Sequence, residues 1–125
     1  MEISNISIGN WLNINSTDYD EFKSIIEYAF KNNINSFDTA SSYNYGEESL
    51  GYAIKNIPRE KIFLSTKYYN TTNKNYIEGV SPEYLNEYIE KSLDKISTNY
   101  LDIIFIHNYK DDMDIKNIMN CINEH

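Results

Sequence analysis

Cysteine, glycine and proline are scarce in this sequence, with one, four and two copies among 125 residues. The single cysteine, Cys121, cannot form a disulfide within the chain, and its apolar-periodic surroundings favour a passive thiol over a nucleophile. Four glycines are too few for a glycine-rich phosphate-binding loop, and no G-x-G-x-x-G pattern follows the first expected strand. The two histidines, His107 and His125, stand apart in the sequence, so no metal site is expected.

Basic residues are also few. There are 11 lysines and arginines against 19 aspartates and glutamates, which gives a net charge of −8 and a pI near 4.6. A chain of this charge repels phosphate backbones, so nucleic acid is not an expected partner. No run of about twenty apolar residues is present, and residues 1–5 lack the pattern of a signal peptide, so we expect a cytoplasmic protein with no membrane partner. Hydrophobic residues make up 41% of the chain, which is enough for one core, and we expect a single domain over residues 1–125.

Short apolar runs alternate with helical patterns along the chain. Strands are expected at residues 6–11, 34–39, 62–67 and 100–107. Helices are expected at about residues 18–33, 47–56, 82–96 and from 113 onward. The strand starts recur at an interval close to the roughly 31 residues per unit of an eight-unit barrel of about 250 residues. A doubly wound sheet gives the same alternation, but it usually has a glycine-rich turn after its first strand. The sequence thus predicts an α/β fold that is a partial (β/α)8 TIM barrel, with about four β/α units and a parallel sheet.

The periodicity also predicts which faces are buried. In the first helix the apolar residues form one stripe, expected to consist of Phe22, Ile25, Ile26, Tyr28, Ala29 and Phe30. Asn33 is expected to end this helix, and Pro82 to occupy the first turn of the third. The fourth strand is nearly all apolar, as expected of a parallel strand covered on both faces. We expect the inner face of the sheet to be apolar as well.

Polar side chains stand at the ends of three expected strands and in one loop. Asp38, Lys67 and His107 close the second, third and fourth strands, and Tyr43 follows Asp38 by five residues. Each has an ordinary alternative when taken singly: Asp38 can cap the serine turn that follows it, Lys67 can be a solvated strand end, and His107 can be a satisfied rim histidine. Barrel enzymes carry their chemistry at the C-terminal ends of the strands. The joint occurrence of an acid, a phenol, an ammonium and an imidazole there predicts a catalytic site.

Several short motifs occur in a fixed order along the chain. Residues 37–43 read F-D-T-A-S-S-Y and are followed at 45–51 by Y-G-E-E-S-L-G. Residues 65–67 read S-T-K, and residues 92–107 contain S-L-D-K-I and then Y-L-D-I-I-F-I-H. These stretches resemble the D-T-A-x-x-Y, Y-G…E…L-G, T-K and S-L-x-x-L…D-y-x-D-x-x-x-x-H motifs of the aldo-keto reductase family. The resemblance covers nearly the whole chain, and the ordered set is far more specific than any one motif.

This resemblance implies the NAD(P)H-dependent reduction of an aldehyde or ketone to an alcohol. In such a reaction an acid must protonate the developing alkoxide as hydride arrives at the carbonyl carbon. By resemblance, Tyr43 is the general acid, Lys67 and Asp38 tune it, and His107 orients the oxygen of a small carbonyl substrate. A tyrosine suits this role because a nearby cation makes the loss of its proton easier.

The first strand supplies candidates on the cofactor side. Gly9, Asn10 and Trp11 stand where the family usually has G-T-W or G-T-Y at the nicotinamide end, with Asn10 in place of the threonine. We therefore assign Gly9, Asn10, Trp11 and Asp38 to cofactor binding. For Trp11, packing in the core is an equal alternative.

The main departure from the family pattern is length. A family member has eight units, and its later strands carry the nicotinamide-stacking aromatic, the amide-binding side chains and the basic residues that hold the 2′-phosphate of NADPH. We therefore expect this chain alone to bind NADPH or NADH weakly, and to self-associate or be completed by a second half-barrel. Two functions stay open: a reductase represented by its N-terminal half, and a truncated, non-catalytic half-barrel acting as a binding or assembly module. The sequence leaves open the carbonyl substrate, the cofactor preference and whether His125 is a natural chain end.

Overall fold

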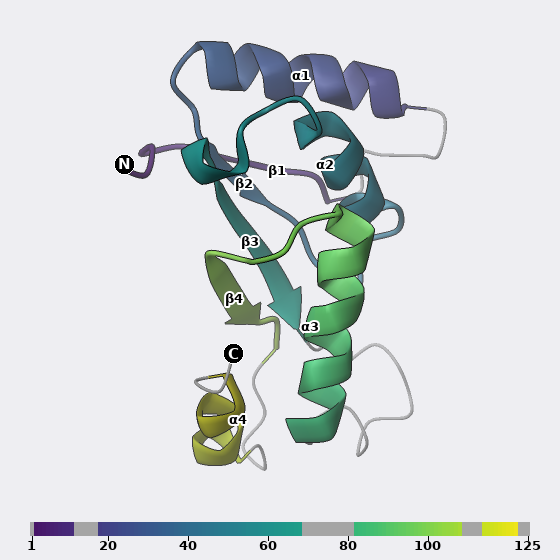
Figure 1. Cartoon of the computed structure of the whole chain (residues 1–125), viewed down its shortest axis with the longest axis vertical. Coiled ribbons are helices and arrows are strands. Elements are labelled where there is room, and N and C mark those ends of the chain that lie inside the picture. The colour runs from purple at the N-terminus through teal and green to yellow at the C-terminus, as the bar shows by residue number, and fades with distance from the viewer. Residues whose placement is uncertain (1, 12–17, 69–81, 109–113, 123–125) are drawn as a thin grey trace.

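The computed structural model describes residues 2–11, 18–68, 82–108 and 114–122. These residues form a parallel sheet of four strands in the order β1-β2-β3-β4, and each strand is followed by a helix (Figure 1). The strands are β1 Ser7–Gly9, β2 Ser36–Asp38, β3 Phe63–Tyr68 and β4 Ile103–Ile106. The helices are α1 Tyr19–Lys31, α2 Gly46–Ile54, α3 Pro82–Ile96 and α4 Ile115–Ile122, with a short 3-10 turn at Arg59–Lys61. This is the predicted α/β architecture, part of a (β/α)8 barrel, although every strand except β3 is shorter than expected.

The register of the sheet brings the strand ends together. Gly9 pairs with Asp38, Asp38 with Ser65, and Ser65 with Ile103, so one row of residues crosses all four strands. Because neighbouring residues of a strand point to opposite faces, members of this row share a face of the sheet. Lys67 lies two residues beyond Ser65 and therefore points to the same face.

The outer face of the sheet carries the hydrophobic core. Phe37 and Leu64 are fully buried there and pack with the apolar stripes of α1 and α2, including Ile26 and Leu50. A second buried cluster lies between the end of β3 and helices α3 and α4, and consists of Tyr68, Leu85, Ile89 and Ile118. The helices thus fix the positions of β2 and β3 from behind, on the side opposite to the row of strand-end residues.

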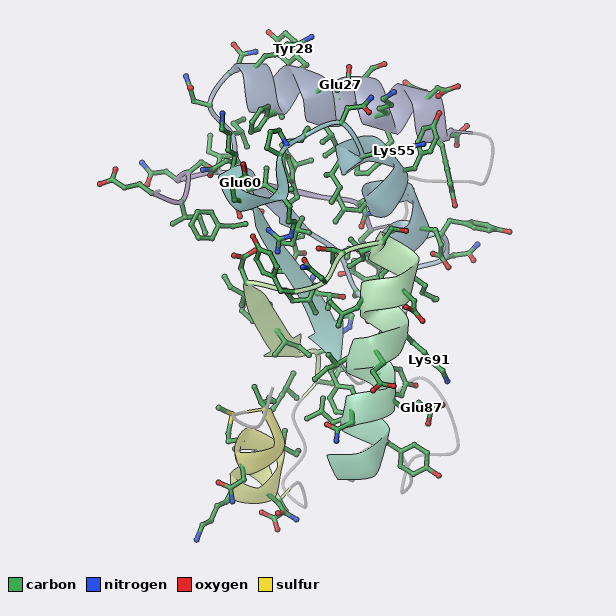
Figure 2. The ribbon with its side chains drawn as sticks, in the orientation of Figure 1. Glu27, Tyr28, Lys55, Glu60, Glu87 and Lys91 are labelled. Atoms are coloured by element: carbon green, nitrogen blue, oxygen red, sulfur yellow. The ribbon has the colours of Figure 1, made fainter. Side chains whose placement is uncertain are left out.

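The buried stripe of helix α1 is narrower than the sequence periodicity predicts. Phe22, Ile26 and Ala29 are buried, whereas Ile25 and Tyr28 are exposed, which corrects our expectation for these two. In Figure 2 Tyr28 stands on the outer side of α1, away from the rest of the molecule. The last residue of the helix is Lys31, two residues before the expected end at Asn33. Asn33 has a φ of 64°, the left-handed conformation that asparagine tolerates better than most residues and that is common just after a helix.

Close approaches fix helix α2 against its neighbours. A Cβ atom on Gly51 would lie 2.5 Å from the Ile96 carbonyl oxygen at the end of α3, so only glycine allows this contact. At the other end, a Cβ on Gly46 would lie 2.7 Å from the Tyr43 Cβ atom and 2.9 Å from the Thr39 hydroxyl oxygen. The first turn of α2 therefore rests directly on the loop that carries Tyr43.

The inner face of the sheet is more polar than we expected. Apart from Phe63, which pairs with Ser36, the residues of β1, β2 and β3 on this face are small or polar, and β4 contributes Ile103 and Phe105. A shallow cavity of about 400 Å³ on this face is lined in part by Ser7, Gly9, Ser36, Asp38, Ser65, Ile103 and Phe105. The expectation that β4 is covered on both faces is also wrong, because Ile103 and Phe105 are 38% and 46% exposed. Their alternating neighbours, Ile104 and Ile106, pack toward α3 and α4. The continuous apolar run of β4 is typical of a strand that is covered on both faces, and the described residues cover one of them.

Candidate functional site

The core of the site is an ion pair between the ends of two adjacent strands. Lys67 Nζ donates to Asp38 Oδ2, and it also donates to the Thr39 carbonyl oxygen at 2.8 Å. The other carboxylate oxygen, Asp38 Oδ1, accepts a hydrogen bond from Ser65 Oγ at 2.7 Å. Ser41 donates instead to the Lys67 carbonyl oxygen at 2.9 Å, so the turn-capping alternative does not describe Asp38. Both oxygens of the carboxylate are thus committed to β3, which fixes the ammonium group at the end of that strand.

Tyr43 is placed by the turn between β2 and α2. Its backbone N–H donates to the Ala40 carbonyl oxygen at 3.0 Å, and its own carbonyl oxygen accepts from Gly46 N at 3.1 Å. Lys67 Nζ lies 5.1 Å from the centroid of the Tyr43 ring, within the range of a cation–π interaction. A positive charge therefore stands next to the phenol ring, held there by Asp38.

His107 approaches the same ring from β4. It follows that strand directly, and its backbone N–H donates to the Tyr68 carbonyl oxygen at 2.7 Å. Its imidazole lies edge-on to the Tyr43 ring, with centroids 5.7 Å apart and an interplanar angle of 82°. The Ser42 hydroxyl lies 3.4 Å from His107 Nδ1. The structure therefore brings Asp38, Tyr43, Lys67 and His107 together, as their sequence positions suggested.

The environment of His107 favours the neutral imidazole. Partial burial lowers its pKa below the ordinary value, and the nearby charge of Lys67 lowers it further, while Asp38 acts in the opposite direction. A neutral imidazole has one N–H donor and one acceptor nitrogen. It can therefore donate a hydrogen bond to a carbonyl oxygen without adding a second positive charge to the site.

The three residues assigned to the first strand do not behave alike. Gly9 lies in register with Asp38, at the edge of the site. Asn10 is buried and turned toward α2, where its Nδ2 atom donates to the Gly46 carbonyl oxygen at 2.6 Å. Trp11 is 62% exposed, which makes core packing the wrong alternative, and its ring centroid is 6.5 Å from that of Tyr43. Asn10 thus supports the start of α2, whereas Trp11 and Gly9 border the reactive groups.

Sequence reasoning missed Ser65, which holds the second oxygen of Asp38. A usable signal was present, because Ser65 and Lys67 are two residues apart on one strand and must share a face. Reasoning also missed the buried Glu47, whose carboxylate accepts a hydrogen bond from Thr66 Oγ1 at 2.8 Å. No local pattern marks that residue as buried, since an acidic residue in the first turn of a helix is usually solvated.

The charges of the described site residues balance one another. Among the described residues of the site the cation is Lys67, and Asp38 neutralises it, so these residues offer no free counter-charge for the phosphates of a nicotinamide cofactor. Within the described ranges, no group of three or more histidine, cysteine, aspartate or glutamate side chains could hold a metal ion. In the same part of the chain, no helix has the length and apolar character needed to cross a membrane.

The fold is part of a parallel α/β barrel. Its polar site combines an aspartate, a lysine and a histidine at the carboxyl ends of the strands with a tyrosine from the turn after β2, so the chain is a barrel protein with its site at the carboxyl ends of the strands. Comparison with known proteins identifies the family. The model of the aldo/keto reductase family matches residues 5–125, so the chain belongs to that family.

Individual relatives agree with this assignment. A Glycine max protein named "Probable aldo-keto reductase 1" is 39% identical over 90 residues, covering 67% of this chain and 25% of that protein. The NADH-specific methylglyoxal reductase of Escherichia coli is 31% identical over 87 residues, covering 59% of this chain and 27% of that protein. A crystal structure of a thermostable aldo-keto reductase with the inhibitor epalrestat shares the fold, with a TM-score of 0.83 at 24% identity over 99% of this chain and 45% of that one. The chain thus spans less than half the length of these proteins.

Proposed function

We propose that this chain supplies the proton-transfer half of the active site of an NAD(P)H-dependent reductase that converts a small aldehyde or ketone to an alcohol. The observation that carries the proposal is the contact of Lys67, held by Asp38, with the ring of Tyr43. Family membership supports carbonyl reduction in general. The particular carbonyl and the assignment of residue roles are our proposal.

In this mechanism Tyr43 donates its phenolic proton to the carbonyl oxygen of the substrate. The ammonium of Lys67 stabilises the phenolate that remains, because the two opposite charges then lie close together in a partly buried site. Asp38 keeps the ammonium in place through its ion pair. His107, neutral and edge-on to the same ring, donates a hydrogen bond that orients the carbonyl oxygen toward Tyr43.

The cofactor, when bound, supplies the hydride that reduces the carbonyl carbon. Of the described residues, Gly9, Trp11 and Asp38 border the place that its nicotinamide end would occupy. We propose that this chain alone holds NADPH or NADH weakly, because phosphate groups require positive charge or amide donors and, among the described residues of the site, the positive charge of Lys67 is already paired with Asp38. A relative is named as NADH-specific, and we leave the choice of cofactor open.

The assigned roles can be tested in a chimeric protein with a complete barrel. In this chimera residues 1–125 replace the part of the thermostable reductase to which they are similar, and the rest of that reductase follows them. NADPH- or NADH-dependent reduction of methylglyoxal is then followed by the absorbance of the nicotinamide. Tyr43→Phe is expected to lower kcat by about 100-fold or more with little change in cofactor affinity, as removal of a general acid should. Tyr45→Phe is the matched control, because Tyr45 stands two residues further on and precedes α2 as its N-cap residue.

Two outcomes would contradict the proposal. A Tyr43→Phe variant that keeps more than roughly a tenth of the activity would show that Tyr43 is not the general acid. A folded, cofactor-binding barrel without any carbonyl reduction would instead favour the alternative function, a non-catalytic half-barrel that serves as a binding or assembly module.

A further inference from the structure

Glu47 is a buried carboxylate for which the proposed mechanism has no use. It lies in the first turn of α2 and is only 1% exposed. Its Oε1 atom accepts the hydrogen bond from Thr66 Oγ1 at 2.8 Å, and its Oε2 atom lies 3.8 Å from Lys95 Nζ on α3. Burying a carboxylate is costly unless donors compensate it, so this arrangement requires a structural reason. Because Glu47 has almost no exposed surface, contact with a substrate is not that reason.

Thr66, which donates this hydrogen bond to Glu47, is a sequence neighbour of the residues that bind Asp38. Thr66 lies between Ser65 and Lys67, the two residues that hold the carboxylate of Asp38. Because side chains alternate along a strand, Thr66 points to the outer face while its two neighbours point to the inner face. The hydrogen bond to Glu47 therefore anchors β3 from behind at the level of the ion pair.

Glu47 is also connected, through Gly46, to the turn that carries Tyr43. Glu47 directly follows Gly46, whose N–H donates to the Tyr43 carbonyl oxygen at 3.1 Å. Gly46 has no room for a Cβ atom against Tyr43, since the two Cβ positions would be 2.7 Å apart. A movement of the first turn of α2 is thus transmitted to Tyr43, and a movement of Thr66 is transmitted to Lys67.

We propose that Glu47 is a positioning residue, which through Thr66 sets the separation between Lys67 on β3 and Tyr43 on the turn before α2. This inference rests on the proposed function for its catalytic meaning. The two other contacts of this region are secondary, because Lys95 is partly exposed, its distance to Glu47 is long, and it also pairs with Glu48 at 3.4 Å. The Lys95–Glu48 pair is exposed on both sides, and exposed ion pairs contribute little. The hydrogen bond from Thr66 is the contact that matters.

Two substitutions separate positioning from simple stabilisation. Thr66→Val removes the hydroxyl with little change of shape, whereas Lys95→Met removes the ion pair and leaves the hydrogen bond intact. The imidazole of His107 is the reporter, because it touches the Tyr43 ring, and NMR titration of the full chain has only His125 as a second signal. We expect Thr66→Val to raise the pKa of His107 toward its ordinary value, and to weaken the nuclear Overhauser contact between the two rings. Lys95→Met is expected to leave both unchanged.

Two further variants control for misfolding and test whether a restored hydroxyl restores the His107 titration. Glu47→Asp keeps the charge but shortens the side chain by one methylene, and it should shift the His107 titration as Thr66→Val does. Thr66→Ser restores the hydroxyl and should return the titration to that of the native chain. If Thr66→Val and Glu47→Asp lower the melting temperature but leave the His107 titration and the ring contact as they are in Lys95→Met, Glu47 is only a stabilising residue and the proposal is overturned. These signals require no turnover, so they are independent of the kinetics of Tyr43→Phe.

Discussion

At the scale of single residues, the lowered pKa of His107 makes a prediction about stability. Burial and the charge of Lys67 lower this pKa below about 6.5, the ordinary value, so the unfolded chain takes up the proton first as the pH falls. The stability that neutral His107 contributes is therefore complete above that pH and is lost as the pH falls through the lower, folded-state pKa. Urea unfolding at about pH 7.5 and about pH 5.5 should show a larger loss of unfolding free energy for the native chain than for His107→Gln.

The difference between the two chains is the informative quantity, because the carboxylates titrate in both. NMR titration should give the signal that disappears in His107→Gln a pKa below the ordinary value of histidine. Equal losses of unfolding free energy in the two chains, or an unshifted His107 signal, would contradict the environment that the structure gives this side chain.

At the scale of elements, the guanidinium of Arg59 connects the segments that precede β3 and β4. Arg59, in the turn before β3, donates from Nη2 to Asp102 Oδ2 at 2.6 Å and to the Tyr100 carbonyl oxygen at 3.0 Å, and from Nε to Thr98 Oγ1 at 3.0 Å. Asp102 Oδ2 also accepts from Leu64 N of β3 at 2.9 Å. Lysine cannot reproduce this planar set of donors. Arg59→Lys should therefore lower the unfolding free energy by about 1–3 kcal/mol in chemical denaturation.

A surface ion pair provides the control for this prediction. Lys91 and Glu87 pair on the outer side of α3, where both side chains are exposed (Figure 2). Lys91→Met should leave the unfolding free energy nearly unchanged, because exposed ion pairs contribute little to stability. If the two variants lose the same stability, the Arg59 contacts do not hold the strand entries together in solution.

At the scale of the whole molecule, the open inner face predicts association of the isolated chain. β1 and β4 form the edges of the described sheet, and Ile103 and Phe105 are exposed beside the β4 edge. Unpaired edges and exposed apolar side chains favour pairing with another copy or with a complementary half-barrel. Sedimentation of the native chain should show a mass that rises with concentration, and Phe105→Ser should reduce this rise. Tyr28→Ser is the control, because Tyr28 is 71% exposed on α1, far from the open face. A native chain that stays monomeric over the whole concentration range would contradict the prediction.

Local sequence patterns determined the order of the elements and the clustering of the strand-end residues. Helix and strand periods can be recognised over a few residues of sequence. Parallel pairing of β2 with β3 places the ends of these strands at one edge of the sheet, and this brings Asp38 and Lys67 close together. Only the tertiary structure decided which apolar residues are covered and which polar ones are buried. Ile25 and Tyr28 fit the period of α1 but are exposed, while Glu47 is buried where Thr66 and Lys95 reach it from distant parts of the chain. Burial depends on what lies opposite a side chain in space, and a local period carries no information about that.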